Sequence, residues 1–275
     1  MHASPPSSAA ALFHIAFYKF VRLEEPDAVA ASLRGLAQAL LGSVLVAPEG
    51  VNGVLAGEAA ALDRFEQAVR QDARFADMVF KRTTCRTAPF ARLKVHSRPE
   101  IVLLGVQGID AVSHKGIDVP PREWRELIAQ DDVVVIDNRN SFEYRLGRFR
   151  NAVDPGVDHF RDFPRFIEDH LPQWRAEGKR IAMYCTGGIR CEKTSAWMHD
   201  LGVPVHQLQG GILNYFLQMP DADRDWEGAC FVFDNRVALD TRLQETAATP
   251  EDVYGGEPAW KWRLQRARRL EQDGE

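Results

Sequence analysis

Cysteine is scarce in this chain, with four residues among 275. Cys185 and Cys191 have five residues between them, and Cys85 and Cys230 lie far from both in the sequence. This spacing matches neither a C-x-x-C redox pair nor a zinc-binding motif, and four thiols are too few for a disulfide framework in a chain of this length. We therefore expect reduced thiols, in a reducing compartment, and no metal site.

Long apolar runs and a strong charge of either sign are also lacking. No apolar run reaches the ~18 residues of a membrane span, and the net charge is −5. A mildly acidic chain is not a uniformly basic nucleic-acid binder, so contact with RNA requires a local basic patch. The apolar stretch near the N-terminus has no basic segment before it, and His14 and Lys19 interrupt it, so no signal peptide is predicted. We expect a cytoplasmic protein, with neither a membrane nor DNA as a partner.

Residues 11–104 are predicted to form an α+β domain after a disordered lead-in at residues 1–10, which is rich in proline and serine. Residues 12–21 are apolar in both alternation phases, as in a strand that is covered on both faces. Helical spacing of apolar residues follows Pro26 and recurs from Leu62 to Val69. With further strands predicted at residues 43–47, 53–56 and 78–84, the order is βαββαβ, which is typical of ferredoxin-like and acylphosphatase-like folds.

Residues 121–220 are predicted to form a second domain, of the parallel α/β class, after a linker at residues 105–120 that contains glycine and proline without periodicity. Strands and helices alternate there, with apolar runs at Val133–Asp137 and Ile181–Tyr184. Such alternation places a functional site at the carboxyl ends of the strands. Residues 221–275 form a C-terminal extension with a basic helix at residues 258–271, which could contact RNA or dock its tryptophans on the core.

Cys185 follows the second of these apolar runs and is the predicted nucleophile. The residues from Cys191 onward have helical character, so the segment between the two cysteines must turn sharply. Gly187 and Gly188 let successive backbone N–H groups point into one concavity, and the helix adds the positive end of its dipole. Such a setting lowers the pKa of a thiol from ~8.5 toward or below neutrality. The alternative is a buried structural cysteine at an ordinary strand-to-helix turn.

The string CTGGIR, from Cys185 to Arg190, resembles the active-site loop of rhodanese domains. In those domains the loop cysteine carries a persulfide within a cradle of backbone amides. The resemblance assigns the cradle to Thr186, Gly187, Gly188 and Ile189. A loop one residue longer would resemble related phosphatases, so the shorter ring favours sulfur over phosphate. Arg190 closes the loop with a guanidinium that suits an anionic ligand or a sulfur species.

A narrower resemblance covers most of the chain. The strings CTGGIRCEK, APEGVNG, DNRNSFEYRLGRF and CFVFDNRV are together similar to the rhodanese-containing tRNA uridine(34) hydroxylase family. This resemblance implies an oxygen-dependent hydroxylation at C5 of the wobble uridine, with the tRNA anticodon region as partner and molecular oxygen as co-substrate. No cofactor can be identified from the residues, and the reductant is unknown. The alternative is a sulfurtransferase that uses thiosulfate or a persulfide donor.

Basic residues gather in the stretch between Lys81 and Arg98 and are the candidate tRNA contacts. An acidic protein with one such stretch can offer it to phosphates, and the alternative is a solvated strand edge. The candidates are Lys81, Arg82, Arg86, Arg92, Lys94 and Arg98.

Three further features bear on the site. Cys191 begins the helix after the loop, and either resolves a persulfide or sulfenic acid on Cys185 or packs in the core. Asp137, Arg139 and Glu143 are predicted to satisfy one another and nearby backbone amides as a brace beneath the loop, with a direct catalytic role as the alternative.

The C-terminal extension of many relatives carries several cysteines, whereas this chain has none after Cys230. A zinc site in the extension is therefore not expected.

Overall fold

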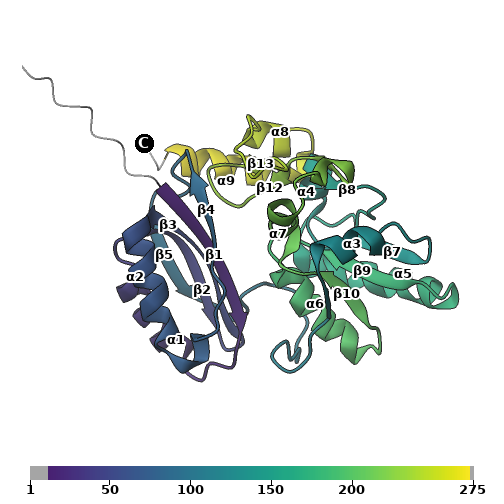
Figure 1. Ribbon diagram of the computed structural model, residues 1–275, viewed down its shortest axis with the longest axis horizontal. Coiled ribbons are helices and arrows are strands. Elements are labelled where there is room, and N and C mark those ends of the chain that lie inside the picture. The colour runs from purple at the N-terminus through teal and green to yellow at the C-terminus, as the bar shows by residue number, and fades with distance from the viewer. Residues whose placement is uncertain (1–11, 273–275) are drawn as a thin grey trace, which may run out of the picture.

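The computed structural model describes residues 12–272, so the predicted lead-in at residues 1–10 lies outside the described part of the chain. Two sheets lie side by side, each with its own helices, and the C-terminal segment lies across the top in the view of Figure 1. The first sheet has five strands in the order β4-β1-β3-β2-β5, and the second has four in the order β6-β10-β9-β7.

The N-terminal domain has the predicted βαββαβ order, with one additional strand. Its elements are β1 (Leu12–Phe20), α1 (Pro26–Leu36), β2 (Leu41–Ala47), β3 (Gly50–Glu58), α2 (Ala59–Arg70), β4 (Lys81–Cys85) and β5 (Leu93–Ser97). Strand β5 was not predicted; it pairs in parallel with β2 at the edge of the sheet, whereas the other pairs are antiparallel. The predicted strand at residues 78–84 begins later, at Lys81, because Met78 closes a turn onto Phe75 in the core.

Strand β1 is covered on both faces, as its apolar residues predicted. Ile15 and Phe17 belong to the core beneath α1 and α2. Tyr18 and Phe20 point the other way, into a cluster that includes Ala196 of the second domain. The sheet of the first domain therefore packs on the second domain through the face opposite its helices, as Figure 1 also shows.

The second domain is a parallel sheet between two helical layers. Its elements are β6 (Ile117–Val119), α3 (Pro121–Leu127), β7 (Val133–Asp137), α4 (Ser141–Leu146), β8 (Gly147–Phe149), α5 (Phe163–Ala176), β9 (Arg180–Tyr184), α6 (Ile189–Asp200), β10 (Val205–Leu208) and α7 (Gly211–Gln218). Helices α5 and α6 contribute to the core on one face of the sheet, and α3 and α7 to the core on the other.

The predicted linker at residues 105–120 contains an edge strand of this sheet. Strand β6 pairs in parallel with β10. The strand has three residues, two of them exposed, and includes Asp118, so it carries no apolar periodicity that could reveal it. Ala111 within this segment and Leu104 just before it are also buried, so the connection between the domains packs on the rest of the protein at these points.

The C-terminal extension folds back over α4. Its elements are β11 (Trp226–Gly228), β12 (Cys230–Phe231), β13 (Ala238–Leu239), α8 (Pro250–Tyr254) and α9 (Lys261–Gln272). Strand β11 pairs with β8, and Trp260 packs with Phe142 of α4 in a separate apolar cluster. Of the two tryptophans expected near the start of the basic helix, Trp260 is thus docked on the core, whereas Trp262 is exposed.

Candidate active site

Cys185 lies just beyond the carboxyl end of β9, and α6 begins four residues later at Ile189. The turn between them depends on Gly188, whose φ of +107° is a conformation that side chains other than glycine rarely adopt. A Cβ atom at this position would also lie 2.7 Å from the hydroxyl oxygen of Tyr18. The loop backbone is thus fixed both by its own conformation and by a side chain from the N-terminal domain.

The sulfur of Cys185 receives hydrogen bonds at the N-terminus of α6. The backbone N–H of Gly188 donates to Sγ at 3.1 Å, and the backbone N–H and the thiol of Cys191 donate as well. The residue is 1% exposed. Burial alone would raise its pKa, but the hydrogen bond from the Cys191 thiol, the charge of Arg190 and the two amides outweigh it. They hold the pKa of Cys185 well below its usual range, which favours the thiolate form.

Cys191 is buried against Cys185 and is the weaker acid of the two. Burial and its hydrogen bond to Cys185 raise the pKa of Cys191 well above its usual value. Its sulfur also lies 3.9 Å from the side-chain nitrogen of Asn138. Cys191 is therefore placed as a hydrogen-bond donor toward the Cys185 sulfur, and the two residues form no disulfide.

Arg190 forms an ion pair with Glu143 of α4. The two side chains form a bidentate ion pair with N–O distances of 2.8 and 2.9 Å, and Arg190 also donates to Thr186 Oγ1 at 3.3 Å. Glu143 was predicted, together with Asp137 and Arg139, to satisfy these residues and nearby backbone amides. Glu143 does accept from the backbone N–H of Asn140 at 3.1 Å in a capping box, but its ion-pair partner is Arg190.

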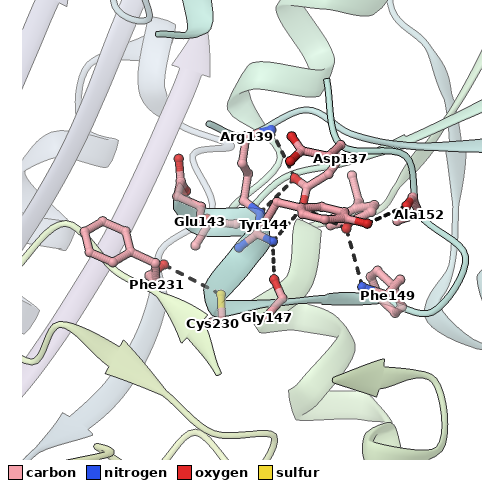
Figure 2. Close-up of polar contacts among 12 residues, drawn as sticks. Asp137, Arg139, Glu143, Tyr144, Gly147, Phe149, Ala152, Cys230 and Phe231 are labelled. Carbon is pink, nitrogen blue, oxygen red and sulfur yellow. Dashed lines mark hydrogen bonds and ion pairs between the residues drawn. The ribbon is translucent and has the colours of Figure 1, made fainter. Parts of the chain in front are cut away.

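Asp137 and Arg139 form their own buried pair at the end of β7. Arg139 donates to Asp137 Oδ2 at 2.6 Å and to the carbonyl oxygen of Gly147 at 2.6 Å, and Tyr184 donates to the same carboxylate at 2.8 Å. Figure 2 shows Arg139 reaching from Asp137 toward Gly147, with Glu143 to one side. These contacts connect β7, β8 and β9 directly beneath the loop. Cys230 is also buried here, and burial raises its pKa to about 12.

The N-terminal domain contributes side chains to the loop. Lys81 donates to the carbonyl oxygen of Gly187 at 2.6 Å and to that of Gly210 at 2.8 Å. Tyr18 donates to Glu192 Oε2 at 3.0 Å. Lys193, one residue further along α6, is buried and pairs with Glu49 at 2.8 Å and with Glu100. Cys185 therefore lies at the junction of the two domains.

The candidate tRNA contacts do not form one row. Lys81 and Arg82 lie on β4, at one edge of the first sheet, and Lys94 lies on β5, at the other edge. Lys81 points to the Cys185 loop, and Arg82 pairs with Asp63 and Glu66. The remaining three candidates, which are exposed, are Arg86, whose guanidinium donates to the backbone of Glu245, Arg92, and Arg98.

Sequence reasoning missed two side chains near the loop. Tyr18 was read only as an apolar strand residue. Phe233, in the string CFVFDNRV, is 58% exposed, and its ring centroid lies 5.9 Å from the guanidinium carbon of Arg190. Phe231 packs edge-on against this ring at 4.9 Å between centroids. An aromatic residue two positions from another in a strand-like string was the available signal, but it could not reveal which ring is exposed.

Within residues 12–272, His114, His199 and Asp200 bring three potential metal-ligand atoms within 4.8 Å of one another. His199 and Asp200 lie at the opposite end of α6 from Cys185, about 16 Å along the helix axis. Among the helices of the same residues, none is both long and apolar enough to cross a membrane.

The two domains match known families. Residues 13–101 match the UPF0176 acylphosphatase like domain, and residues 120–217 match the rhodanese-like domain. A tRNA uridine(34) hydroxylase of Synechococcus elongatus is 46% identical over 234 residues, which cover 84% of this chain and 86% of that protein. A tRNA uridine(34) hydroxylase of Legionella pneumophila strain Corby is 43% identical over 230 residues, which cover 82% of this chain and 90% of that protein. This chain belongs to the tRNA uridine(34) hydroxylase family, with a UPF0176 N-terminal domain followed by a rhodanese domain.

Proposed function

We propose that this protein is an oxidoreductase that hydroxylates C5 of uridine 34 in tRNA, with molecular oxygen as co-substrate and Cys185 as the reacting group. The observation that carries the proposal is the Cys185 loop, which holds a thiolate among amide donors in a chain at 43–46% identity to tRNA uridine(34) hydroxylases. Sequence similarity supports the substrate, and the geometry supports a nucleophile.

A thiolate has a direct use in this chemistry. Addition of Cys185 Sγ to C6 of the uracil ring moves electron density to C5, which then becomes the carbon that is oxidised. Departure of the C5 proton and cleavage of the S–C6 bond restore the aromatic ring and the thiolate. The overall reaction places one oxygen atom on C5 and releases the other as water, so two electrons and two protons must come from an external reductant.

The Cys185 loop is partly exposed at Thr186 and Gly187, although Cys185 itself is 1% exposed, and we propose that a base approaches from this side. A Cβ atom at Gly187 would have no neighbouring atom within 4 Å, and Thr186 and Gly187 are only half-buried. An anticodon loop supplies unstacked bases that a protein can take out of the strand. Arg92, Lys94 and Arg98 are our proposed phosphate contacts, with Phe233 as an aromatic surface beside the loop.

Sulfur transfer is the second candidate function, and the six-residue length of the Cys185 loop favours it. In that reaction Cys185 would carry a persulfide, and the amides of Gly188 and Cys191 would bind its terminal sulfur. The basic residues would then have no part in the reaction.

The test is nucleoside mass spectrometry of tRNA from cells that lack the protein, complemented with the wild type or with Cys185→Ser. The proposal expects nucleosides derived from 5-hydroxyuridine to return with the wild type alone. Equal amounts in all three strains, in a background without a redundant route, would contradict it and favour sulfur transfer.

A further inference from the structure

The carbonyl groups of the Cys185 loop all point outward to donors. The carbonyl of Cys185 accepts from the backbone N–H of Ile212 at 3.0 Å, that of Thr186 from Leu213 at 3.2 Å, and that of Gly188 from Glu192 at 3.0 Å. Helices α6 and α7 provide these three donors from within the rhodanese domain. The carbonyl of Gly187 differs, because its donor is the ammonium group of Lys81 in the N-terminal domain, at 2.6 Å.

The Gly187 carbonyl and the Gly188 N–H belong to the same peptide group. In a planar trans peptide the C=O and N–H bonds point in opposite directions. A donor that holds the oxygen on one side therefore aims the N–H to the other side, where Cys185 Sγ lies 3.1 Å from the Gly188 nitrogen. A hydrogen bond at the oxygen also polarises the peptide and strengthens the bond that its N–H donates.

This peptide needs an external anchor more than its neighbours do. It lies between two glycines, and glycine has the widest range of backbone conformations, so rotation of the peptide plane costs little here. The second hydrogen bond of Lys81, to Gly210 at 2.8 Å, fixes the ammonium group against the turn before α7. One hydrogen bond of Lys81, to Gly210, thus fixes its ammonium group, and the other, to Gly187, holds the loop.

We propose that Lys81 is a positioning residue of the catalytic loop, which keeps the Gly187–Gly188 peptide oriented so that its N–H donates to the Cys185 thiolate. The N-terminal domain then completes the active site rather than serving only as an RNA-binding module. The inference rests on the proposed function only in taking Cys185 as the reacting group. In this proposal Lys81 positions the loop, instead of contacting a tRNA phosphate as the sequence predicted.

Other ionisable groups around the loop also influence the pKa of Cys185. They come from each element packed on it: Tyr18 from β1, Glu143 from α4, and Arg190, Cys191 and Glu192 from α6, with Lys115 beside Glu192. Lys81 also acts on Cys185 through its own charge, so replacing it removes both a charge and a hydrogen bond. A second substitution at Gly187, which can restore the peptide orientation but not the charge, separates the two effects.

The experiment measures the rate of Cys185 alkylation by iodoacetamide against pH, in the full-length protein, with each cysteine resolved by mass spectrometry. Lys81→Met removes the donor, and Lys81→Arg keeps a charged donor. Lys179→Met is the matched control, because Lys179 also donates to a backbone carbonyl, that of Asp131 at 2.8 Å, but at the other end of β9.

We expect the alkylation midpoint of Lys81→Met to lie about one pH unit above that of the wild type, with Lys81→Arg closer to the wild type and Lys179→Met unchanged. Adding Gly187→Ala to Lys81→Met should lower the midpoint again, because alanine restricts the peptide and its Cβ meets no atom within 4 Å. A wild-type midpoint in folded Lys81→Met would overturn the proposal. If Lys81→Met does not fold, Lys81→Gln, which is polar but shorter, takes its place with the same expected rise and the same contradicting result. The midpoint does not depend on tRNA, so this outcome is separate from that of the hydroxylase test.

Discussion

Glu143 accepts both hydrogen bonds of a bidentate ion pair from Arg190, at 2.8 and 2.9 Å, beneath the Cys185 loop. The pair joins α4 to the first turn of α6, and so connects two of the strings that mark the family, DNRNSFEYRLGRF and CTGGIRCEK. Both side chains are buried. Arg190 is thereby fixed beside the thiolate, and its charge is balanced by the carboxylate as well as by the sulfur.

Replacing Glu143 by glutamine should destabilise the fold strongly, because it removes the carboxylate of the buried ion pair and leaves the Cys185 sulfur as the remaining counter-charge of Arg190. Removing one partner of a buried ion pair costs about 3–5 kcal/mol. Glu257→Gln is the control, since Glu257 pairs with Arg145 at 2.6 Å in an exposed position, where a pair contributes about 1 kcal/mol or less. Chemical denaturation of the two variants should show this difference. Equal losses would contradict the buried-pair account.

The same pair predicts how stability depends on pH. Burial alone would raise the pKa of Glu143, but the charge and hydrogen bonds of Arg190 outweigh it and lower the pKa below its ordinary value. When the pKa of Glu143 is lower in the folded state, the stability that the ionised carboxylate contributes is fully present above its unfolded-state pKa of about 4.3. This stability is lost as the pH falls through the folded-state pKa. Wild-type stability should therefore fall more steeply than that of Glu143→Gln below about pH 4.5. Parallel curves from thermal melts at each pH would refute this reading.

Replacing Cys191 separates its two candidate roles. Cys191→Ala removes the thiol that donates to Cys185, so the alkylation midpoint of Cys185 should rise by about one pH unit, whereas Cys191→Ser keeps a donor and should stay near the wild type. If Cys191 also resolves an oxidised sulfur, serine should preserve the midpoint but abolish turnover. An unchanged midpoint in Cys191→Ala would exclude the hydrogen-bond role.

Charge reversal at Arg92 and Lys94 tests the proposed tRNA surface. Arg92→Glu with Lys94→Glu should weaken tRNA binding and reduce the slope of log affinity against log salt by about 0.7–0.9 for each phosphate that the protein no longer neutralises. Arg165→Glu is the control, because Arg165 is an exposed arginine on α5, in the other domain. An unchanged affinity and salt slope in the double variant would remove this stretch from the tRNA surface.

Phe233 tests whether an aromatic ring beside Arg190 takes part in RNA binding. Phe233→Ala should weaken binding of an anticodon stem-loop by about 1–3 kcal/mol, the range for loss of one stacked base, and Phe233→Tyr should retain most of it. Leu217→Ala removes an exposed apolar side chain from α7 and should have no effect. Equal affinities for Phe233→Ala and the wild type would show that this ring does not stack on a base.

Much of the fold could be predicted because its signals are local. Each signal depends on residues that are neighbours in the sequence. These signals are the apolar side chains on both faces of residues 12–20, the turn-forming glycines 187 and 188, and the alternation of strand and helix patterns. Strands β5 and β6 could not be predicted in this way. Each has three to five residues at the edge of a sheet, and each is held by pairing with a distant strand rather than by its own pattern.

The candidate site shows the same division. The position of Cys185 at a strand-to-helix turn could be predicted from one continuous string, and of the four residues predicted as its cradle, Gly188 donates to the sulfur. The roles of Lys81 and Glu143 could not, because both depend on contacts across more than 40 positions of the sequence, with Gly187 and Arg190 respectively. A basic residue in a basic stretch is more often at the surface, and only the packing of the two domains turns Lys81 toward the loop.

The most direct test of the central claim follows oxygen into tRNA. Purified protein is added to a desalted extract of cells that lack it, which supplies the reductant, together with tRNA from the same cells, under oxygen gas labelled with the heavy isotope. The account predicts labelled 5-hydroxyuridine at position 34 with the wild type, none with Cys185→Ser, and none without oxygen. Labelled product at the wild-type level with Cys185→Ser, or product that carries oxygen from water instead, would contradict it.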